Sequence, residues 1–387
     1  MTPAELSRTV RHAVCRAVED DVLPGPVPEQ VTVERSRPGG RGDYASNVAL
    51  RLAGPAGRPP REIAEILRSR VDTTRGIARV EITGPGFLNF TLGRDSRADL
   101  VRTILRDPAR YGYGEALAGT AVAFAPPPAA DVRARVWTDT VVRLLRSQGA
   151  EAAVVPGAVE RPALVPAAPA PDPAPAPGPD PAPGPDADTD PSTGTGTDGG
   201  PDPDGLFVRL GRDAAHWALL RPAAHDRPYT GPDLLVQRES NALFRVRYAY
   251  ARTRAVVRNA AQLGMTPTPA GYAEEPPGIP QAEPPAEPPA QATPAQAAAT
   301  SALFTALGDH PAALEAAARL RAPDRLARHL ELTAEAFLRF QESCRPLPIG
   351  DEKPSAAHRS RTALAEAAGA VLAGGLSLLG IDAPEHL

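Results

Sequence analysis

The sequence predicts an α+β fold, in which a small mixed domain and an all-helical domain are separated by a proline-rich segment. Strand-like alternation occurs only before residue 156, and long stretches with helical spacing of apolar residues dominate the second half. The 47 prolines and 33 glycines are concentrated in two blocks. Segments of that composition cannot bury enough apolar surface to fold. The 387 residues therefore leave room for two or three folded domains.

Composition limits the chemistry and the compartment. The chain has a net charge of −4, and every one of its 42 basic residues except Lys353 is an arginine. Cys15 and Cys344 are too few and too far apart to form a disulfide framework or a metal site, so we expect no metal and no cofactor. The N-terminus has no apolar signal core, and no apolar run approaches membrane-spanning length. We expect a cytoplasmic protein that does not contact a membrane.

Residues 1–115 are expected to form the small α+β domain. Thr2 and Glu5 are spaced as a capping box around Pro3, which begins a helix. Its apolar face consists of Leu6, Val10, Ala13, Val14, Ala17 and Val18. The other expected elements are strands over 31–34, 78–82 and 87–92 and helices over 45–52 and 61–71.

Residues 116–155 read as a single βα unit followed by a short strand. The expected elements are a strand over 121–124, a helix over 131–148 and a strand over 152–155. Residues 156–205 form the larger proline-rich block, in which nine acidic residues accompany Arg161 alone. We expect this block to be a disordered, extended linker that reaches on the order of 100 Å. RNA would repel its charge, so it is interpreted as a tether, with docking of a protein partner on its proline motifs as the alternative.

Residues 206–387 are expected to form a helical bundle with a disordered insert at 266–300. Its longest helix is predicted to run from Asp233, as the cap, to Gly264, as the stop. The apolar stripe of this helix consists of Leu235, Ala242, Val246, Ala249, Val256 and Ala260. The remaining helices are expected over 301–307, 311–320, 323–344 and from 355 onwards.

The long helix is the candidate binding element. It carries six arginines against Asp233 and Glu239, a local charge of +4. Arg245, Tyr248 and Arg252 are three and four residues apart and share one face. Arginine binds phosphate through two N–H groups, and a tyrosine ring stacks on an unpaired base. The alternative is a solvated arginine face on a packed structural helix.

The N-terminal region resembles the add-on domain of the arginyl-tRNA synthetase family. The resemblance rests on GDYASNVALRLAGPAGRPPREIAEILRSRV at 42–71 and IARVEITGPGFLNFTL at 77–92. It implies that Phe87 and Asn89 contact the corner of a tRNA, through ring stacking and a base-edge hydrogen bond. The alternative makes Phe87 a core residue and Asn89 a hydrogen bonder within its turn.

The C-terminal region resembles the DALR anticodon-binding bundle of the same family. The evidence is Tyr248-Ala249-Tyr250-Ala251-Arg252 and the ending GLSLLGI-x-x-PE. The motif implies that Tyr248 and Arg252 contact an anticodon loop. Helix geometry adds Arg245, Arg254 and Arg258 to this candidate site. Cys344 lies in a region that matches a family loop, and we expect it to be a buried small side chain rather than a reactive thiol.

The catalytic signatures of that family are missing. Where the family has an HxGH-type loop after the first strand, this chain has Ala125-Pro126-Pro127-Pro128-Ala129-Ala130. The family's lysine-bearing mobile loop has no counterpart, because Lys353 is the only lysine and lies near the C-terminus. Adenylation needs positive charge at its transition state. We therefore interpret residues 116–155 as a vestige of the catalytic fold and expect a protein that is not an enzyme.

These observations predict a catalytically inactive relative of arginyl-tRNA synthetases. It would bind tRNA at the corner and the anticodon loop, with an arginine-accepting tRNA as the candidate ligand. One alternative is a protein-interaction scaffold that has lost RNA binding. Another is a component of an arginine–tRNA ligase that needs a catalytic partner in trans.

Overall fold

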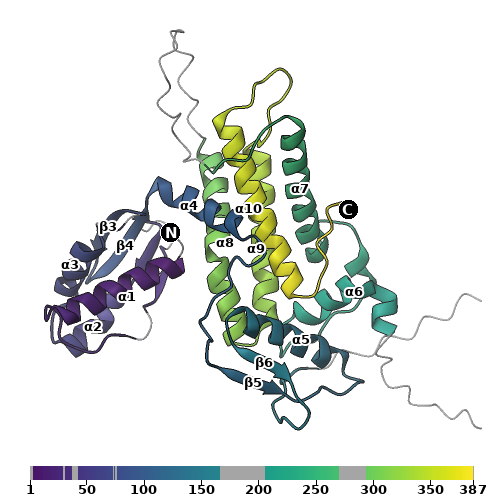
Figure 1. Cartoon of the computed structure of the whole chain (residues 1–387), viewed down its shortest axis with the longest axis horizontal. Coiled ribbons are helices and arrows are strands. Elements are labelled where there is room, and N and C mark those ends of the chain that lie inside the picture. Colours follow the sequence, from purple (N-terminus) through teal and green to yellow (C-terminus); the bar gives the residue numbers. More distant parts are fainter. Residues whose placement is uncertain are drawn as a thin grey trace, which may run out of the picture.

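The computed structural model describes residues 3–28, 31–36, 42–72, 74, 76–165, 205–269 and 293–386. It confirms the α+β fold, with a small antiparallel sheet domain, a parallel strand pair and a helical bundle (Figure 1). The expected linker from residue 166 onwards, residues 270–292 of the expected insert and Thr2 lie outside the described residues. Within the described part, no helix is both long enough and apolar enough to cross a membrane.

The N-terminal domain is a four-stranded antiparallel sheet in the order β1-β2-β4-β3, with helices packed against it. Its core includes Leu6, Val10, Leu67, Leu88 and Phe90, all fully buried. The helices are α1 (Pro3–Glu19), α2 (Val48–Ala56) and α3 (Pro60–Val71), and the strands are β1 (Val33–Arg35), β2 (Tyr44–Ser46), β3 (Ile77–Thr83) and β4 (Phe87–Leu92).

Two predicted elements of this domain are corrected by strand pairing. The expected helix over 45–52 begins only at Val48, because Tyr44–Ser46 forms β2 between β1 and β4. Ser46 Oγ also donates a hydrogen bond of 2.7 Å to the carbonyl of Thr32, which holds this stretch extended. The expected strand over 31–34 is shifted to Val33–Arg35, where its backbone pairs with β2.

The sequence patterns missed helix α4 (Arg94–Arg106), which links the sheet domain to the bundle. Its apolar residues Leu100, Val101 and Ile104 are buried in the bundle core rather than in the sheet domain. In Figure 1 this helix leaves the sheet domain and crosses the α8–α10 bundle. The expected small domain of residues 1–115 therefore ends with a helix that packs on its neighbour.

The βα unit of residues 116–155 is present as predicted. Strands β5 (Ala121–Phe124) and β6 (Glu151–Val154) pair in parallel, and α5 (Val132–Ser147) connects them, capped by Asp131. The unit packs on the bundle, since Trp137 Nε1 donates a 3.2 Å hydrogen bond to the carbonyl of Arg321. The first residues of the expected linker also belong to this fold, because Glu160 pairs with Phe124 beside β5.

The bundle consists of α6 (Gly205–Leu220), the short 3-10 helix η1 (Pro232–Leu235), α7 (Ala242–Gln262), α8 (Pro294–Arg319), α9 (Pro323–Ser343) and α10 (Ala356–Leu378). Helix α8 corrects two predictions. It starts within the expected insert, where Thr293 and Gln296 form a capping box, and it runs through Pro311 as one helix instead of two. Proline has no N–H for the carbonyl four residues earlier, but the Tyr111 hydroxyl donates a 2.9 Å hydrogen bond to that carbonyl, on Leu307.

Candidate nucleic-acid interface

Helix α7 begins eight residues later than the sequence predicts, at Ala242 rather than directly after Asp233. Its cap is Asn241, whose side-chain oxygen accepts from the amides of Leu243 (3.1 Å) and Phe244 (3.3 Å). The same side chain donates to the carbonyls of Leu234 and Val236, and so ties η1 to the helix start. Leu235 is consequently outside the apolar stripe and is 51% exposed. The predicted stop is confirmed, because Gly264 has a φ of 66° just after the helix.

The arginines of α7 lie on two flanks of its buried stripe. The stripe contains Val246, Ala249, Thr253, Val256 and Ala260, which are all buried. With about 100° of rotation per residue, Arg245, Tyr248 and Arg252 fall within about 60° of one another. Arg254 and Arg258 lie roughly 180° and 220° around the helix from Arg245. The five residues predicted as one anticodon site therefore form two separate surfaces, named here the tyrosine flank and the tail flank.

The tyrosine flank consists of Arg245, Tyr248 and Arg252 and faces α9. Arg245 Nη2 lies 4.0 Å from a carboxylate oxygen of Glu331, and Arg252 Nε donates a 3.3 Å hydrogen bond to Gln341. Tyr248 is 39% exposed and stacks on Phe244, with ring centroids 5.7 Å apart and planes 18° from parallel. Phe244 was not predicted as a site residue, although its position four residues before Tyr248 is the sequence signal for such a pair.

The tail flank consists of Arg247, Arg254 and Arg258 and faces the C-terminal segment and α6. Arg254 Nη2 and Arg258 Nη1 lie 2.9 and 3.6 Å from the carboxylate of Glu385. Arg247 Nη1 lies 3.4 Å from the carboxylate of Asp213. In Figure 1 the C-terminal segment passes beside α7. The positive charge on this flank is thus matched by carboxylates of the same chain.

Phe87 and Asn89 both lie at the start of β4, after the turn that follows β3, but their side chains differ in access. Phe87 is 39% exposed, whereas Asn89 is 7% exposed. Asn89 Nδ2 donates to Thr83 Oγ1 at 2.8 Å and to the carbonyls of Glu81 and Phe87 at 3.3 Å. The exposed ring is therefore carried on a turn that the buried amide holds in shape.

The two predicted RNA sites are well separated. Figure 1 shows the sheet domain beside α8, and α7 on the other side of α9 and α10. A ligand that contacts both Phe87 and Tyr248 must therefore extend around the bundle. Among the described residues, no group of three or more histidine, cysteine or acidic side chains is placed to hold a metal. Cys344 is buried, as predicted.

The end of β5 is closed by structural contacts. The backbone amide of Ala125 donates to the carbonyl of Glu160 at 2.8 Å, and Arg321 pairs with the Glu160 carboxylate. Beside them, the fully buried Arg133 donates to the carbonyls of Leu219 (3.3 Å), Ala223 (2.9 Å) and Asp226 (2.8 Å), and also to that of Val165. Arg133 thereby joins the chain before residue 166 to the chain after residue 204.

In comparisons with known proteins, both terminal regions of the chain match known domain families. Residues 4–92 match the arginyl tRNA synthetase N terminal domain, and residues 246–387 match the DALR anticodon binding domain. An arginine–tRNA ligase of Frankia alni is 28% identical over an alignment of 570 residues that covers 100% of both chains. One from Renibacterium salmoninarum is 40% identical over 161 residues, which are 39% of this chain and 29% of that relative.

Solved structures show the same fold. The arginyl-tRNA synthetase of Thermus thermophilus has a TM-score of 0.63 at 15% identity, with 100% of both chains covered. That of Plasmodium falciparum has a TM-score of 0.58 at 10% identity, with 100% of this chain and 99% of that chain covered. The chain therefore has a fold similar to that of arginyl-tRNA synthetases. In sequence, residues 4–92 are similar to the N-terminal domain of arginyl-tRNA synthetases and residues 246–387 to the DALR anticodon-binding domain, and the 387 residues make this chain shorter than a full synthetase.

Proposed function

We propose that this protein binds tRNA without aminoacylating it, with the corner of the tRNA on the N-terminal domain and the anticodon loop on α7. The observation that carries this proposal is the combination of two matched domains with an altered middle. The add-on and DALR domains flank a βα unit in which Ala125–Ala130 stands where an HxGH-type loop is expected. The ligand that fits this combination best is an arginine-accepting tRNA.

On α7, the tyrosine flank is the proposed contact for the anticodon loop. The paired rings of Phe244 and Tyr248 offer a flat apolar surface on which an unpaired base stacks. Arg245 and Arg252 lie on either side of Tyr248 along the helix and supply the charge for adjacent phosphates. The side chain of Arg245 is 33% exposed, and an ion pair at that exposure is worth at most about 1 kcal/mol. A phosphate can therefore replace Glu331 at little cost.

The tail flank has a supporting role in this proposal. Arg254 and Arg258 lie about 120° and about 80° around the helix from Tyr248 and share Glu385. RNA that reaches them must displace the carboxylate or add to its network. Their proposed role is to contribute to the positive electrostatic potential around the loop and not to recognise a base.

At the tRNA corner, Phe87 is the proposed stacking residue. Its exposed ring sits on a turn, as a ring that binds a splayed-out loop base requires. Asn89 acts through that turn, because its amide donates to Thr83, Glu81 and Phe87 itself. This assignment keeps both predicted residues in the corner site, with Phe87 as the contact and Asn89 as its support.

The proposed loss of catalysis has an electrostatic reason. Stabilising the charge that develops on ATP phosphates needs lysines or histidines at the end of the first strand. None of the histidines lies between residues 13 and 215, and the only lysine is Lys353. Glu160 and Arg133 occupy the space beside β5 with contacts that hold the fold together. These features support the proposal that only one βα unit of the catalytic fold remains and that its role is structural.

The test is filter binding of the purified chain to total tRNA at two salt concentrations, with sequencing of the retained RNA. We expect enrichment of one isoacceptor family and an affinity that falls steeply with salt, because phosphate contacts release counterions. An aminoacylation assay with the same tRNA should give no charged product. Retention of no tRNA at low salt would overturn the binding proposal, and charging of tRNA would overturn the proposed inactivity.

One observation favours a second candidate, a protein-interaction scaffold. The arginines of the tail flank are matched by Asp213 and Glu385, and the whole chain has a net charge of −4. If these arginines only stabilise the folded structure, the chain would bind RNA weakly at every salt concentration. The filter-binding experiment separates the two candidates, since only phosphate binding produces a strong dependence on salt.

A further inference from the structure

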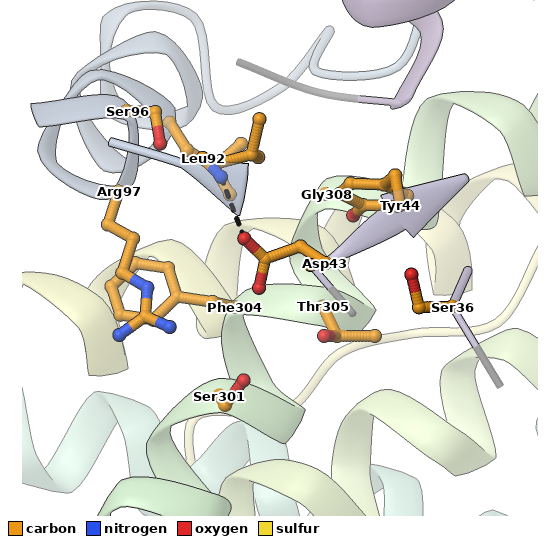
Figure 2. Close-up of a pocket in the computed structure, with 12 residues that line it drawn as sticks. Ser36, Asp43, Tyr44, Leu92, Ser96, Arg97, Ser301, Phe304, Thr305 and Gly308 are labelled. Carbon is orange, nitrogen blue, oxygen red and sulfur yellow. Dashed lines mark hydrogen bonds between the residues drawn. The ribbon is translucent and has the colours of Figure 1, made fainter. Parts of the chain in front are cut away.

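A cavity of about 230 Å³ lies where the N-terminal domain meets helix α8. Figure 2 shows its residues, which come from the segment before β2 and its first residue, from the end of β4 and the start of α4, and from one face of α8. The cavity is remote from the tyrosine flank, and the proposed tRNA contacts make no use of it. It exists only because the sheet domain and the bundle pack against each other.

Two opposite charges line this cavity without pairing. One carboxylate oxygen of Asp43 accepts a 2.8 Å hydrogen bond from the amide of Leu92, which fixes the group in place. The guanidinium of Arg97 lies over the ring of Phe304, 5.3 Å from its centroid. Within the described residues, neither Asp43 nor Arg97 has an ion-pair partner within 4.0 Å. As far as the described residues are concerned, both charges can therefore contact a bound molecule.

Two hydroxyls of α8 also line the cavity. Ser301 and Thr305 are four residues apart on one helix face, and both are half-buried. In the part of the chain that the structure describes, neither hydroxyl has a hydrogen-bond partner. Figure 2 shows Ser301 below Arg97 and Thr305 below Asp43. Each charge thus has a hydroxyl near it that can share the same ligand group.

The remaining lining is partly apolar, from Leu92, Leu100 and Phe304, and partly polar, from Ser36, Tyr44 and Ser96. Leu100 and Phe304 are 6% and 7% exposed, and Leu92 adds a half-buried side chain. At about 30 Å³ for each water-sized group, the cavity holds a molecule on the order of eight non-hydrogen atoms. Its occupant must combine a cationic group, an anionic group and a short apolar portion.

We propose that this cavity binds a free α-amino acid with an uncharged, apolar side chain. Its carboxylate would be held by Arg97 and Ser301, because guanidinium matches a carboxylate with two parallel hydrogen bonds. Its ammonium group would be held by Asp43 and Thr305, and its side chain by Leu92, Leu100 and Phe304. A simple anion is disfavoured by Asp43, and a simple cation is disfavoured by Arg97. Such a ligand would bridge the two domains and stabilise their docking.

The test is calorimetric titration of the full chain with leucine and with two analogues that each lack one charged group. These analogues are 4-methylpentanoate, without the ammonium group, and 3-methylbutylamine, without the carboxylate. We expect leucine to bind at least about tenfold more tightly than either analogue, since each loses one charge-assisted contact. Arginine and glutamate should bind more weakly than leucine, because their side-chain charges meet apolar walls.

Three variants locate the site. Arg97→Gln should weaken leucine binding at least about tenfold, and Asp43→Asn should remove the preference for leucine over 4-methylpentanoate. Arg102→Gln is the control, because Arg102 is exposed on the same helix and pairs with Asp99 outside the cavity. If Asp43→Asn disturbs folding, as judged by circular dichroism, Thr305→Val tests the same end of the ligand. Thr305→Val should then lower the affinity for leucine more than that for 4-methylpentanoate.

Two results would overturn the proposal. The first is the absence of binding of leucine, valine and isoleucine at concentrations up to about 10 mM. The second is binding of inorganic phosphate that competes with leucine and is unchanged in Asp43→Asn, which would make the cavity a simple anion site. Neither result depends on whether the chain binds tRNA.

Discussion

The Tyr111 hydroxyl donates a 2.9 Å hydrogen bond to the carbonyl of Leu307, which Pro311 leaves without its helical partner. Burial raises the pKa of Tyr111, so the phenol stays protonated and remains a donor. This contact joins the segment after α4 to the middle of α8 and keeps α8 continuous through a proline. It has a direct consequence for stability.

Tyr111→Phe should lower the free energy of unfolding by about 1 to 2 kcal/mol, because the Leu307 carbonyl is then buried without a donor. In a Pro311→Ala background the alanine N–H can serve that carbonyl, so the same change should cost less than about 0.5 kcal/mol. Urea denaturation of the four proteins in this double-mutant cycle measures the difference. Equal costs in both backgrounds would contradict the role assigned to Tyr111.

Acid should destabilise the bundle through two buried histidines. The rings of His310 and His329 are in tilted contact, with centroids 5.3 Å apart and planes 35° from parallel, and Tyr111 stacks on His310. Burial, with the charge of His329 as a second cause, lowers the pKa of His310 to about 3, and burial lowers the pKa of His329 to about 4. Below pH about 6.5 the unfolded chain therefore binds more protons than the folded chain. The stability that these histidines leave intact above that pH is lost as the pH falls.

The expected loss is about 1 to 2 kcal/mol per pH unit below pH about 6.5. Urea denaturation at pH about 7.5 and about 5.5 measures it in a window in which carboxylates stay ionised. His310→Gln with His329→Gln should flatten this dependence, whatever its effect on stability at neutral pH. An equally steep dependence in the double variant would assign the acid sensitivity to other groups.

Arg133 should be a major determinant of stability. Arg133→Met leaves a cluster of buried carbonyls, including those of Leu219 and Ala223, without donors. We expect a loss of about 3 kcal/mol or more in the free energy of unfolding. Arg135→Met, on the same helix, is the matched control and should change stability by less than about 0.5 kcal/mol. Thermal or urea denaturation gives both values.

For the proposed anticodon contact, the double variant Tyr248→Ala with Arg252→Ala should weaken tRNA binding by about 1 to 3 kcal/mol. The reason is the loss of one stacking surface and one phosphate contact, while the buried stripe of α7 is untouched. Arg319→Ala, on α8, is the control, because Arg319 pairs with Glu315 on its own helix and, among the described residues, with no other acidic side chain. Filter binding measures both variants, and an unchanged affinity in a well-folded double variant would remove α7 from the binding site.

For the proposed corner contact, Phe87→Ala and Asn89→Ala should have different effects. Phe87→Ala should weaken tRNA binding by about 1 to 3 kcal/mol with little effect on stability, since the ring is exposed. Asn89→Ala should lower stability by about 1 to 2 kcal/mol, because Thr83 and two carbonyls lose a donor. Denaturation and filter binding on both proteins separate the roles. A stable Asn89→Ala protein with weakened binding would make Asn89 a direct contact.

Much of the fold was predictable from local patterns. The apolar spacing of α1, α5, α7 and α9 and the alternation of β3 to β6 indicated these elements, because such patterns report which side of a segment is buried. The turn at Gly264 was predictable because glycine readily adopts a positive φ. The grouping of Arg245, Tyr248 and Arg252 followed from helical spacing alone. The domain families at both ends followed from motifs that the comparisons match.

Boundaries and side-chain roles needed partners that are distant in sequence. Asp233 was a plausible cap, but Asn241 caps α7 because it also ties down η1. Arg254 and Arg258 were assigned to the same site as Tyr248, yet both pair with Glu385 on the tail flank. From the sequence, Asn89 could equally donate a hydrogen bond to a base or within its own turn. In the structure its amide donates to Thr83 in that turn.

The sequence by itself determined the two terminal domain types and which chemical groups the chain lacks, because motifs and residue counts do not depend on packing. Only the tertiary structure decided that α8 passes through Pro311, that the arginines of α7 divide between two surfaces, and that Asp43 and Arg97 line one cavity. The physical reason is the same in each case. Hydrogen bonds, ion pairs and cavities depend on the positions of groups that are far apart in the chain, and local periodicity carries no information about them.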